Sequence, residues 1–148
     1  MGEFSELTKH LMSVYYGGEE QDSLSVMDMF DDGLVVIGTG RHEFYKNLGE
    51  FSAAFGNELE ERGSIKLQLE NMWCDEQRIC EGVVLAYGGV YIHGEKEDKT
   101  ASIDMETRFT VLYRESGGCW KIIHLHQSVP NYEQINDEAY PKILDRQI

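Results

Sequence analysis

The sequence predicts one α+β domain, with helices in its first part and a sheet of long strands in the rest. In most of the first 62 residues, apolar side chains recur every three or four positions, which is typical of helices that bury one face. From residue 65 onwards apolar and polar side chains alternate, which is typical of strands. Helices followed by strands indicate an α+β architecture. The length of 148 residues fits a single domain.

Three helices and one short strand are expected in the first part. The first helix ends at Gly17-Gly18 and carries apolar residues on one side: Phe4, Leu7, Leu11, Val14 and Tyr15. The second is short and holds Leu24, Met27 and Phe30. Asp31-Asp32-Gly33 is expected to turn the chain into a strand at residues 34–37, and the third helix spans residues 49–62.

Four strands are expected after the helices, at residues 65–73, 79–92, 101–114 and 120–129. The charged residues 93–100 are expected to form an exposed connection, and Ser116-Gly117-Gly118 a hairpin turn. Pro130 ends the last strand, because proline has no backbone N–H to donate to a sheet.

The last two strands differ in their faces. One face of the strand at 101–114 is almost wholly apolar, and the other is polar, with Ser102, Asp104, Glu106, Arg108 and Thr110. Strict alternation puts Trp120, Ile122, His124 and His126 on one face of the last strand, and Ile123, Leu125 and Gln127 on the other. A strand with large apolar groups on both faces is usually covered on both. Helices can cover one face and a partner subunit the other, so we expect a homodimer.

Composition limits the classes of partner and the cellular compartment that we expect. A formal net charge of −14 repels a phosphate backbone and an anionic membrane surface, so we expect neither nucleic acid nor a membrane as a partner. The three cysteines have no CxxC spacing, which favours a reducing compartment over a disulfide framework or a zinc knuckle. The acidic residues of the N-terminal helix are unlike a signal peptide. We therefore expect a cytoplasmic protein without a cofactor.

Two segments resemble a known family. Met29-Phe30-Asp31-Asp32-Gly33 through Gly38-Thr39-Gly40 is similar to the front half of a SnoaL-like domain, of the nuclear transport factor 2-like type. Glu106-Thr107-Arg108-Phe109 and the stretch from Gly118 to Ser128, with its His-x-His-x-Ser, are similar to the final hairpin of that family. The hairpin also resembles the association (hub) domain of calcium/calmodulin-dependent protein kinase II.

The resemblance covers roughly residues 3–130, so we expect a SnoaL-like domain at 1–130 and a C-terminal extension at 131–148. It implies a cone-shaped, curved, mixed or antiparallel sheet wrapped around the N-terminal helices, with an open pocket (a cystatin-like roll). It also implies dimerisation through the outer face of the sheet. Members include enzymes and non-catalytic modules, so the fold leaves the function open. Similar domains precede signalling output domains in bacteria.

One branch of the family is implied to use a carboxylate base beside a dry pocket, as ketosteroid isomerase does. The position that matches this base is Ile37, which cannot abstract a proton. This substitution favours a binding module over that enzyme.

Arg108 is the leading candidate for a ligand contact. The pocket arginine of the hub domain implies that Arg108 points into the cone and binds a carboxylate, with Gln127 nearby and His126, Trp73 and Tyr87 on the wall. The alternative is an ion pair between Arg108 and Glu106 or Asp104 on its own strand.

His124 and His126 share a strand face, and Asp104 or Glu106 could complete a metal site with them. A histidine hydrogen-bonded in an interface or a pocket wall is the commoner arrangement, so we expect no metal.

Two hypotheses therefore remain for the function. The first is a non-catalytic, dimeric binding or sensory module for a small anionic or aromatic ligand. The second is a small-molecule enzyme of the isomerase, cyclase or dehydratase type, with His124, His126, Glu106 and Asp104 as candidate acids and bases.

Overall fold

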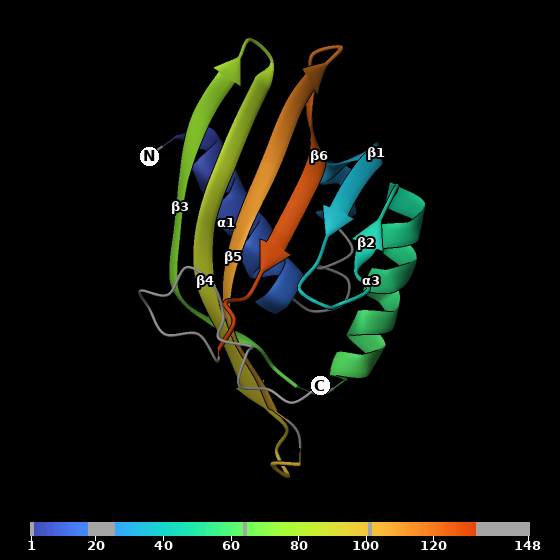
Figure 1. The fold of residues 1–148 in the computed structure, drawn as a ribbon, viewed down its shortest axis with the longest axis vertical. Helices are drawn as coiled ribbons and strands as arrows, with labels where there is room; N and C mark the ends of the chain where they lie inside the picture. The colour runs from blue at the N-terminus through green and yellow to red at the C-terminus, as the bar shows by residue number, and fades with distance from the viewer. Residues whose placement is uncertain (1, 18–25, 64, 101, 133–148) are drawn as a thin grey trace, which may run out of the picture.

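The computed structural model describes residues 2–17, 26–63, 65–100 and 102–132. Its elements, in chain order, are α1 (Glu3–Gly17), a single 3₁₀ turn (Val26–Met29), β1 (Phe30–Ile37), β2 (Phe44–Tyr45), α3 (Leu48–Arg62), β3 (Gln68–Cys80), β4 (Val83–Glu95), β5 (Ser102–Ser116) and β6 (Cys119–Ser128). The six strands form one sheet in the order β2-β1-β6-β5-β4-β3 (Figure 1).

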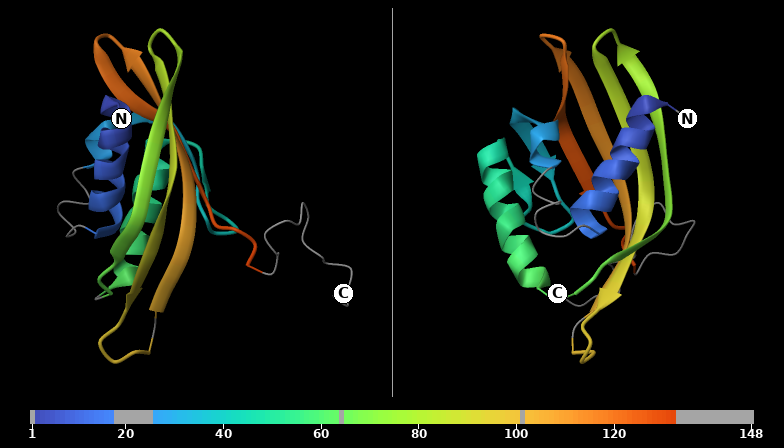
Figure 2. Two further views of the ribbon diagram at one scale, coloured as in Figure 1. Left: turned by 90° about the vertical axis from the view of Figure 1, so that its left-hand side faces the viewer. Right: turned by 180° about the vertical axis from the view of Figure 1, so that it is seen from behind.

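The helices lie on one face of this curved, unclosed sheet, and the opposite face carries no described helix (Figure 2). Neighbouring strands are antiparallel except β1 and β6, which are parallel, so the sheet is mixed. The expected α+β fold, with a curved sheet wrapped around N-terminal helices, is confirmed. Within the described residues, no helix is both long and apolar enough to cross a bilayer.

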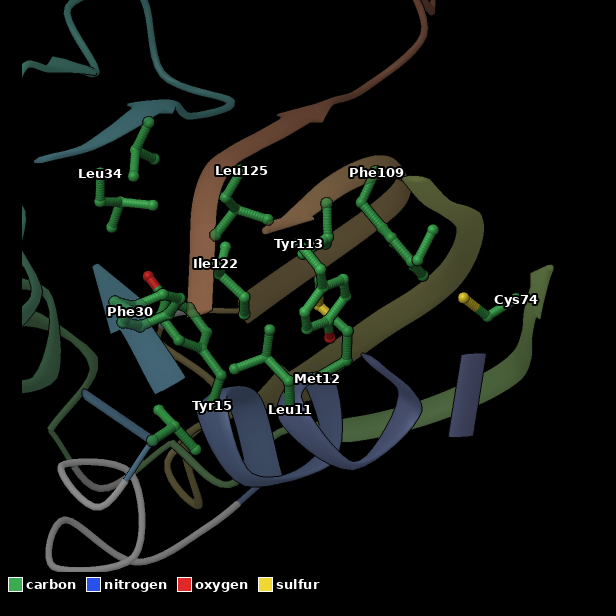
Figure 3. Packing of buried hydrophobic residues seen from close by; sticks show 14 of the residues in the cluster. Leu11, Met12, Tyr15, Phe30, Leu34, Cys74, Phe109, Tyr113, Ile122 and Leu125 are labelled. Carbon is green, nitrogen blue, oxygen red and sulfur yellow. The ribbon is translucent and has the colours of Figure 1, made fainter. Parts of the chain in front are cut away.

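The core lies between the inner face of the sheet and α1 and α3 (Figure 3). The apolar face of β5 is the buried one, and Phe109, Val111 and Tyr113 are each at most 3% exposed. The hydroxyl groups of Tyr113 and Thr8 are hydrogen-bonded at 2.8 Å, and Thr8 also donates to Phe4 O. The buried hydroxyls are therefore satisfied, as a stable core requires.

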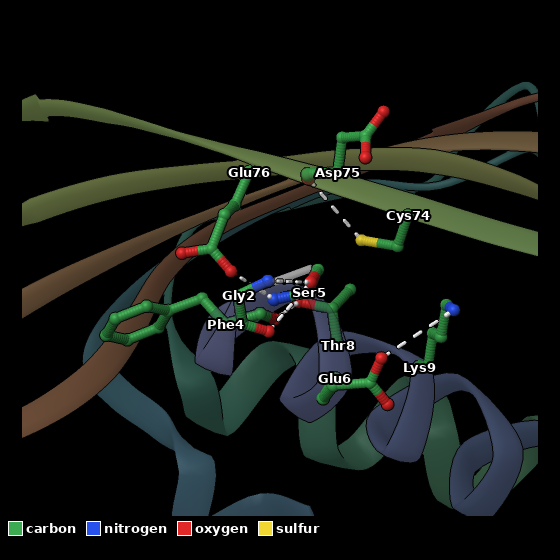
Figure 4. Close-up of polar contacts among 9 residues, drawn as sticks. All are labelled: Gly2, Phe4, Ser5, Glu6, Thr8, Lys9, Cys74, Asp75 and Glu76. Atoms are coloured by element: carbon green, nitrogen blue, oxygen red, sulfur yellow. Dashed lines mark hydrogen bonds and ion pairs between the residues drawn. The ribbon is translucent and has the colours of Figure 1, made fainter.

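The N-terminus of α1 is fixed to the edge strand β3 (Figure 4). The backbone N–H of Ser5 donates to Glu76 Oε1 at 2.8 Å. A carboxylate is favoured there, because the first N–H groups of a helix lack intrahelical partners and carry partial positive charge. This contact joins the start of α1 to the edge of the sheet.

Three expected boundaries were wrong. Asp31-Asp32-Gly33 lies within β1, where the register with β6 shifts between Phe30 and Val35, and so forms a strand irregularity and not a turn. Phe30 begins that strand and does not end a helix, and Leu24 lies outside the described residues. The first long hairpin turns at Glu81-Gly82, because the polar residues 75–78 continue β3 along the exposed edge of the sheet.

Strict alternation also fails in β6. Leu112 pairs with His124 and Tyr113 with Ile122, so Ile123 is an extra residue in the strand. Such a bulge shifts the side-chain phase by one residue. Ile122 and Leu125 therefore both face the core, at 0% and 3% exposure, whereas His124 lies on the outer face of the sheet.

The close approach of β4 to β3 requires glycine at position 88. A Cβ atom on Gly88 would lie 2.0 Å from Trp73 O and 2.9 Å from Phe109 Cζ, which is closer than such atoms can approach. In contrast, a Cβ on Gly56 of α3 would meet nothing within 4 Å. Substitution by alanine at these two positions therefore compares a site that has no space for a methyl group with a site that has.

We expect Gly88→Ala to lower the free energy of unfolding by about 2 kcal/mol or more, because the added methyl forces the strands apart. Gly56→Ala should instead raise it by about 0.5–1 kcal/mol, because alanine favours a helix. Urea denaturation of both variants measures the difference. Equal effects of the two substitutions would contradict the packing described here.

Candidate functional site

Four of the predicted ligand-binding residues lie on the outer face of the sheet. Arg108 is paired with Gly89 of β4, which in turn pairs with Trp73 of β3. Two residues further along β5, Thr110 pairs with Tyr87 of β4 on one side and with His126 of β6 on the other. Trp73 is 52% and Tyr87 36% exposed. The structure thus brings these residues to one face, but that face is turned away from the helices, not into the cone.

Arg108 faces outward because the apolar side of β5 takes the concave position. Its Nη2 donates to Val129 O at 3.4 Å. Nearby on the same face, the Tyr91 hydroxyl donates to Asp104 Oδ1 at 2.7 Å, and the backbone N–H of Glu106 donates to the Tyr132 hydroxyl. The contacts of Arg108 and Glu106 join the first half of β5 to the chain that follows β6. A ligand contact by Arg108 stays a prediction, now for an outer surface.

The two histidines of β6 also lie outside the cone. Their ring centroids are 6.3 Å apart, and His124 Nδ1 is 2.8 Å from Val35 O. Since a carbonyl oxygen can only accept, His124 carries its proton on Nδ1. Among the described residues, no group of three or more histidine, cysteine, aspartate or glutamate side chains is arranged to hold a metal ion.

The cone contains a pocket of about 350 Å³ between the ends of α1 and α3 and the inner face of the sheet. The last turns of these two helices approach each other at the lower end of the sheet (Figure 2). Of the predicted ligand-binding residues, Gln127 alone lines this pocket, among the residues that the structure describes. Its apolar wall is made of Ile65, Leu67, Ile103 and Met105.

Two tyrosines at the end of α1 form the polar wall. The Tyr15 hydroxyl donates to Glu58 Oε2 at 3.0 Å, and the Tyr16 hydroxyl donates to Gln127 Oε1 at 2.7 Å. Burial raises the pKa of both tyrosines well above the ordinary value. Both hydroxyls therefore stay protonated donors at neutral pH.

Arg62, in the last turn of α3, is the buried cation of this pocket. The residue is 9% exposed, and its Nη1 donates to Tyr15 O at 3.5 Å and Tyr16 O at 3.2 Å. These carbonyls belong to the end of α1, which lacks intrahelical donors. Nη2 is buried and has no hydrogen-bond partner among the described residues. A buried donor without a partner is costly and marks a position that a ligand group can satisfy.

Three carboxylates share the pocket with Arg62. Glu58 and Glu61 come from α3, and Glu43 comes from the turn between β1 and β2, where its Oε1 accepts from Gly40 N. A second cavity of about 380 Å³ adjoins the first and shares these three carboxylates and Tyr15. The pKa of Glu58 is raised, chiefly because burial disfavours the charged carboxylate.

Ile37 is not a pocket residue. It pairs with His126 and lies on the outer face, whereas Val36 beside it is buried inward at 3% exposure. The lack of a carboxylate at position 37 therefore carries no information about the chemistry of the pocket, whose carboxylates come from α3 and the turn before β2.

Comparison with protein families matches the model of the SnoaL-like domain over residues 10–132. The chain belongs to the SnoaL-like domain family. This family has both enzymes and non-catalytic modules, so membership fixes the fold and leaves the activity of this SnoaL-like domain open. No curated protein matches the chain.

Solved structures agree on the fold. A protein with a cystatin-like fold from Caulobacter vibrioides superposes with a TM-score of 0.66 at 18% identity, over 88% of this chain and 92% of that one. The hexachlorocyclohexane dehydrochlorinase LinA-type3 from Novosphingobium barchaimii gives 0.64 at 16% identity, over 86% and 90%. The CamKII hub homology domain of Chlamydomonas reinhardtii gives 0.60 at 10% identity, over 85% and 94%.

The sequence contains a signal for the pocket residues of α3, which periodicity alone had not marked as functional. Phe51, Phe55, Glu58 and Arg62 follow one another at helical spacing, so they share one face of α3. Two charged residues that continue an apolar face are expected to point inward. They are the residues that the SnoaL-like domain places against Tyr15 and Tyr16.

The raised pKa of Glu58 predicts a pH-dependent stability. The folded state holds the Glu58 proton more tightly than the unfolded state, so this group favours folding below its ordinary pKa of 4.5. That contribution is lost as the pH rises through the folded-state pKa. Glu58→Gln keeps an acceptor for Tyr15 and cannot ionise. Thermal denaturation should find Glu58→Gln more stable than wild type at pH 7, with the difference disappearing as the pH falls towards 4.5.

Glu60→Gln provides the control, because Glu60 is exposed on the same helix and its substitution removes the same charge. If both variants gain equal stability at pH 7, the gain comes from the lower net charge of the protein. In that case burial of the charged Glu58 carboxylate does not destabilise the fold, and the prediction is wrong.

Proposed function

We propose that this SnoaL-like domain is a homodimeric small-molecule-binding module, and that its ligand occupies the pocket between α1, α3 and the sheet with an anionic group directed to Arg62. The observation that carries the proposal is the buried Nη2 of Arg62, which has no partner among the described residues. A guanidinium binds carboxylate or phosphate oxygens through paired N–H donors. One side of this fork is occupied by α1 carbonyls, and the other is unsatisfied.

The size and the wall of the pocket support this proposal. A volume of about 350 Å³ lies within the range of small-molecule sites. Ile65 and Met105 provide apolar contact, and Tyr16 and Gln127 provide hydrogen bonds at the opposite wall. Because Nη2 is itself covered, a ligand group reaches it only when a pocket side chain moves aside. Met105 is suited to such a movement, since methionine is unbranched and adaptable.

A binding screen with a matched pair of variants tests the location of the ligand. Small aromatic acids, amines and amino acids are screened by ligand-observed NMR against wild type, Met105→Trp and Arg108→Leu. We expect Met105→Trp to weaken the binding of pocket ligands at least tenfold, because the indole fills the cavity. Arg108→Leu, on the outer face, should leave the affinity unchanged. The opposite pattern would place the ligand on the outer face and refute the pocket proposal.

An enzyme of the proton-transfer type is the second candidate, favoured by Glu58. A half-buried carboxylate with a raised pKa that accepts a hydrogen bond from a tyrosine is suited to accept and return a proton. In this candidate the base is Glu58, and Tyr15 is the neighbouring donor. Turnover separates the two candidates: an enzyme should convert a pocket ligand and lose that conversion in Glu58→Gln, whereas a binding module should convert no pocket ligand in either form.

The outer face of the sheet supports the homodimer. Val35, Trp73 and Tyr87 are large apolar residues that are 36–52% exposed on it, and no described helix covers them. Large apolar residues exposed on an uncovered sheet face are typical of an interaction site. A two-fold dimer would bury the same surface of both subunits. The similarity in fold to proteins named as a CamKII association domain and a CamKII hub homology domain points the same way.

We expect the chain to elute as a dimer, with twice its mass of 17.0 kDa, in gel filtration with light scattering. Val35→Glu should give a monomer with a nearly unchanged melting temperature, because a lone charge buried in the interface is costly. Ala53→Glu, at an exposed position of α3, should remain dimeric. A wild-type monomer at tens of micromolar would refute the homodimer.

We further propose that the domain ends near residue 130, with residues 131–148 as an extension, and that the protein works in the cytoplasm. The end of β6 at Ser128 supports the boundary, and the free cysteines Cys74, Cys80 and Cys119 support a reducing compartment.

A further inference from the structure

The pocket holds more negative than positive charge. Glu43, Glu58 and Glu61 line it together with Arg62, so three carboxylates face one guanidinium. A ligand with an anionic group alone would satisfy Arg62 but would also bring a negative charge towards the three carboxylates. A purely anionic ligand would therefore leave the negative charge of the three carboxylates uncompensated.

The positions of the charges allow both signs to be satisfied at once. Glu58 and Arg62 are four residues apart on α3 and share one face, which places their Cβ atoms about 5–6 Å apart. Glu61 is exposed at the rim, whereas Arg62 is buried. Glu43 faces α3 from the turn before β2. The positive end of the pocket is thus deep, and the negative end is nearer to solvent.

The carboxylates interact with one another. Glu43 and Glu61 both contribute to raising the pKa of Glu58, although burial is the main cause, and Arg62 only partly opposes this rise. The Glu58 carboxylate receives one hydrogen bond, from Tyr15. A cationic group between α3 and the turn would relieve the repulsion among the three carboxylates and would supply further donors to Glu58.

We propose that the ligand is zwitterionic, with an anionic group against Arg62, an ammonium group against Glu58, Glu61 and Glu43, and an apolar body against Ile103 and Met105. The inference rests on the proposed binding function and names the chemical class of its ligand: a small amino acid or a similar molecule that carries both charges close together. A purely cationic ligand would leave Arg62 Nη2 without a partner, just as a purely anionic ligand would leave the three carboxylates without a counter-charge.

Two matched series of compounds test the proposal on the full chain. The first consists of L-phenylalanine, 3-phenylpropanoate, which lacks the ammonium group, and 2-phenylethylamine, which lacks the carboxylate. The second consists of L-tryptophan, indole-3-propanoate and tryptamine. Titration calorimetry at pH 7 should show that the amino acid of at least one series binds at least tenfold more tightly than both partners in that series.

A charge-removing variant tests the assignment of the ammonium group. Glu61→Gln should weaken the binding of the amino acid and strengthen that of the propanoate, and so reduce the preference between them about tenfold. Glu61 is exposed, so its substitution should not disturb the fold. Glu60→Gln, the neighbouring exposed glutamate that does not line the pocket, should leave the preference unchanged.

The outcomes separate this inference from the proposed function. If a propanoate binds in the pocket as tightly as its amino acid, the ligand is a plain anion; the zwitterion is refuted, and the binding function stands. The same conclusion follows if the broader screen finds pocket ligands and all of them carry a single charge. If no compound of the series or the screen binds in the pocket, both the zwitterion and the binding function are refuted.

Discussion

The contact between Arg62 and the end of α1 is the interaction on which the site depends. It joins the last turns of two helices that are far apart in the sequence, through carbonyls that would otherwise lack partners. Because Tyr15 and Tyr16 supply these carbonyls, their hydroxyls are placed at the same time, one against Glu58 and the other against Gln127. The guanidinium of Arg62 thus fixes the backbone of both tyrosines through Nη1, while Nη2 has no partner among the described residues.

The fold and one of its faces could be predicted from the sequence because both follow from local periodicity. Alternation along β5 identified its apolar face, and the structure buries that face at Phe109, Val111 and Tyr113. The same reasoning could not decide where Arg108 would lie relative to the pocket until it was known that the apolar face is the concave one. That choice depends on the helices that pack against the sheet.

Apart from Gln127, the residues of the candidate site escaped prediction for two physical reasons. The extra residue Ile123 in β6 reverses the phase of the strand, and no local sequence signal distinguishes a bulge there from regular alternation. The pocket itself is formed mainly by the ends of helices, where Glu58 and Arg62 resemble the charged residues of any solvated helix surface. Their spacing with Phe51 and Phe55 was the available signal, and it concerns a helix face and not a motif.

The bulge at Ile123 divides β6 into two parts with opposite phase. One part supplies Trp120 and Ile122 to the core beside Phe4, and the other supplies Leu125 to the core and Gln127 to the pocket. A regular strand could not do both, since one of the two parts would turn its apolar residues outward. The number of residues in β6 is therefore constrained. Loss of one residue within it would exchange the faces of one part, and either the core or the pocket would then lose its lining. Related sequences that keep this pocket should consequently vary in length at the hairpin turns, and not within β6.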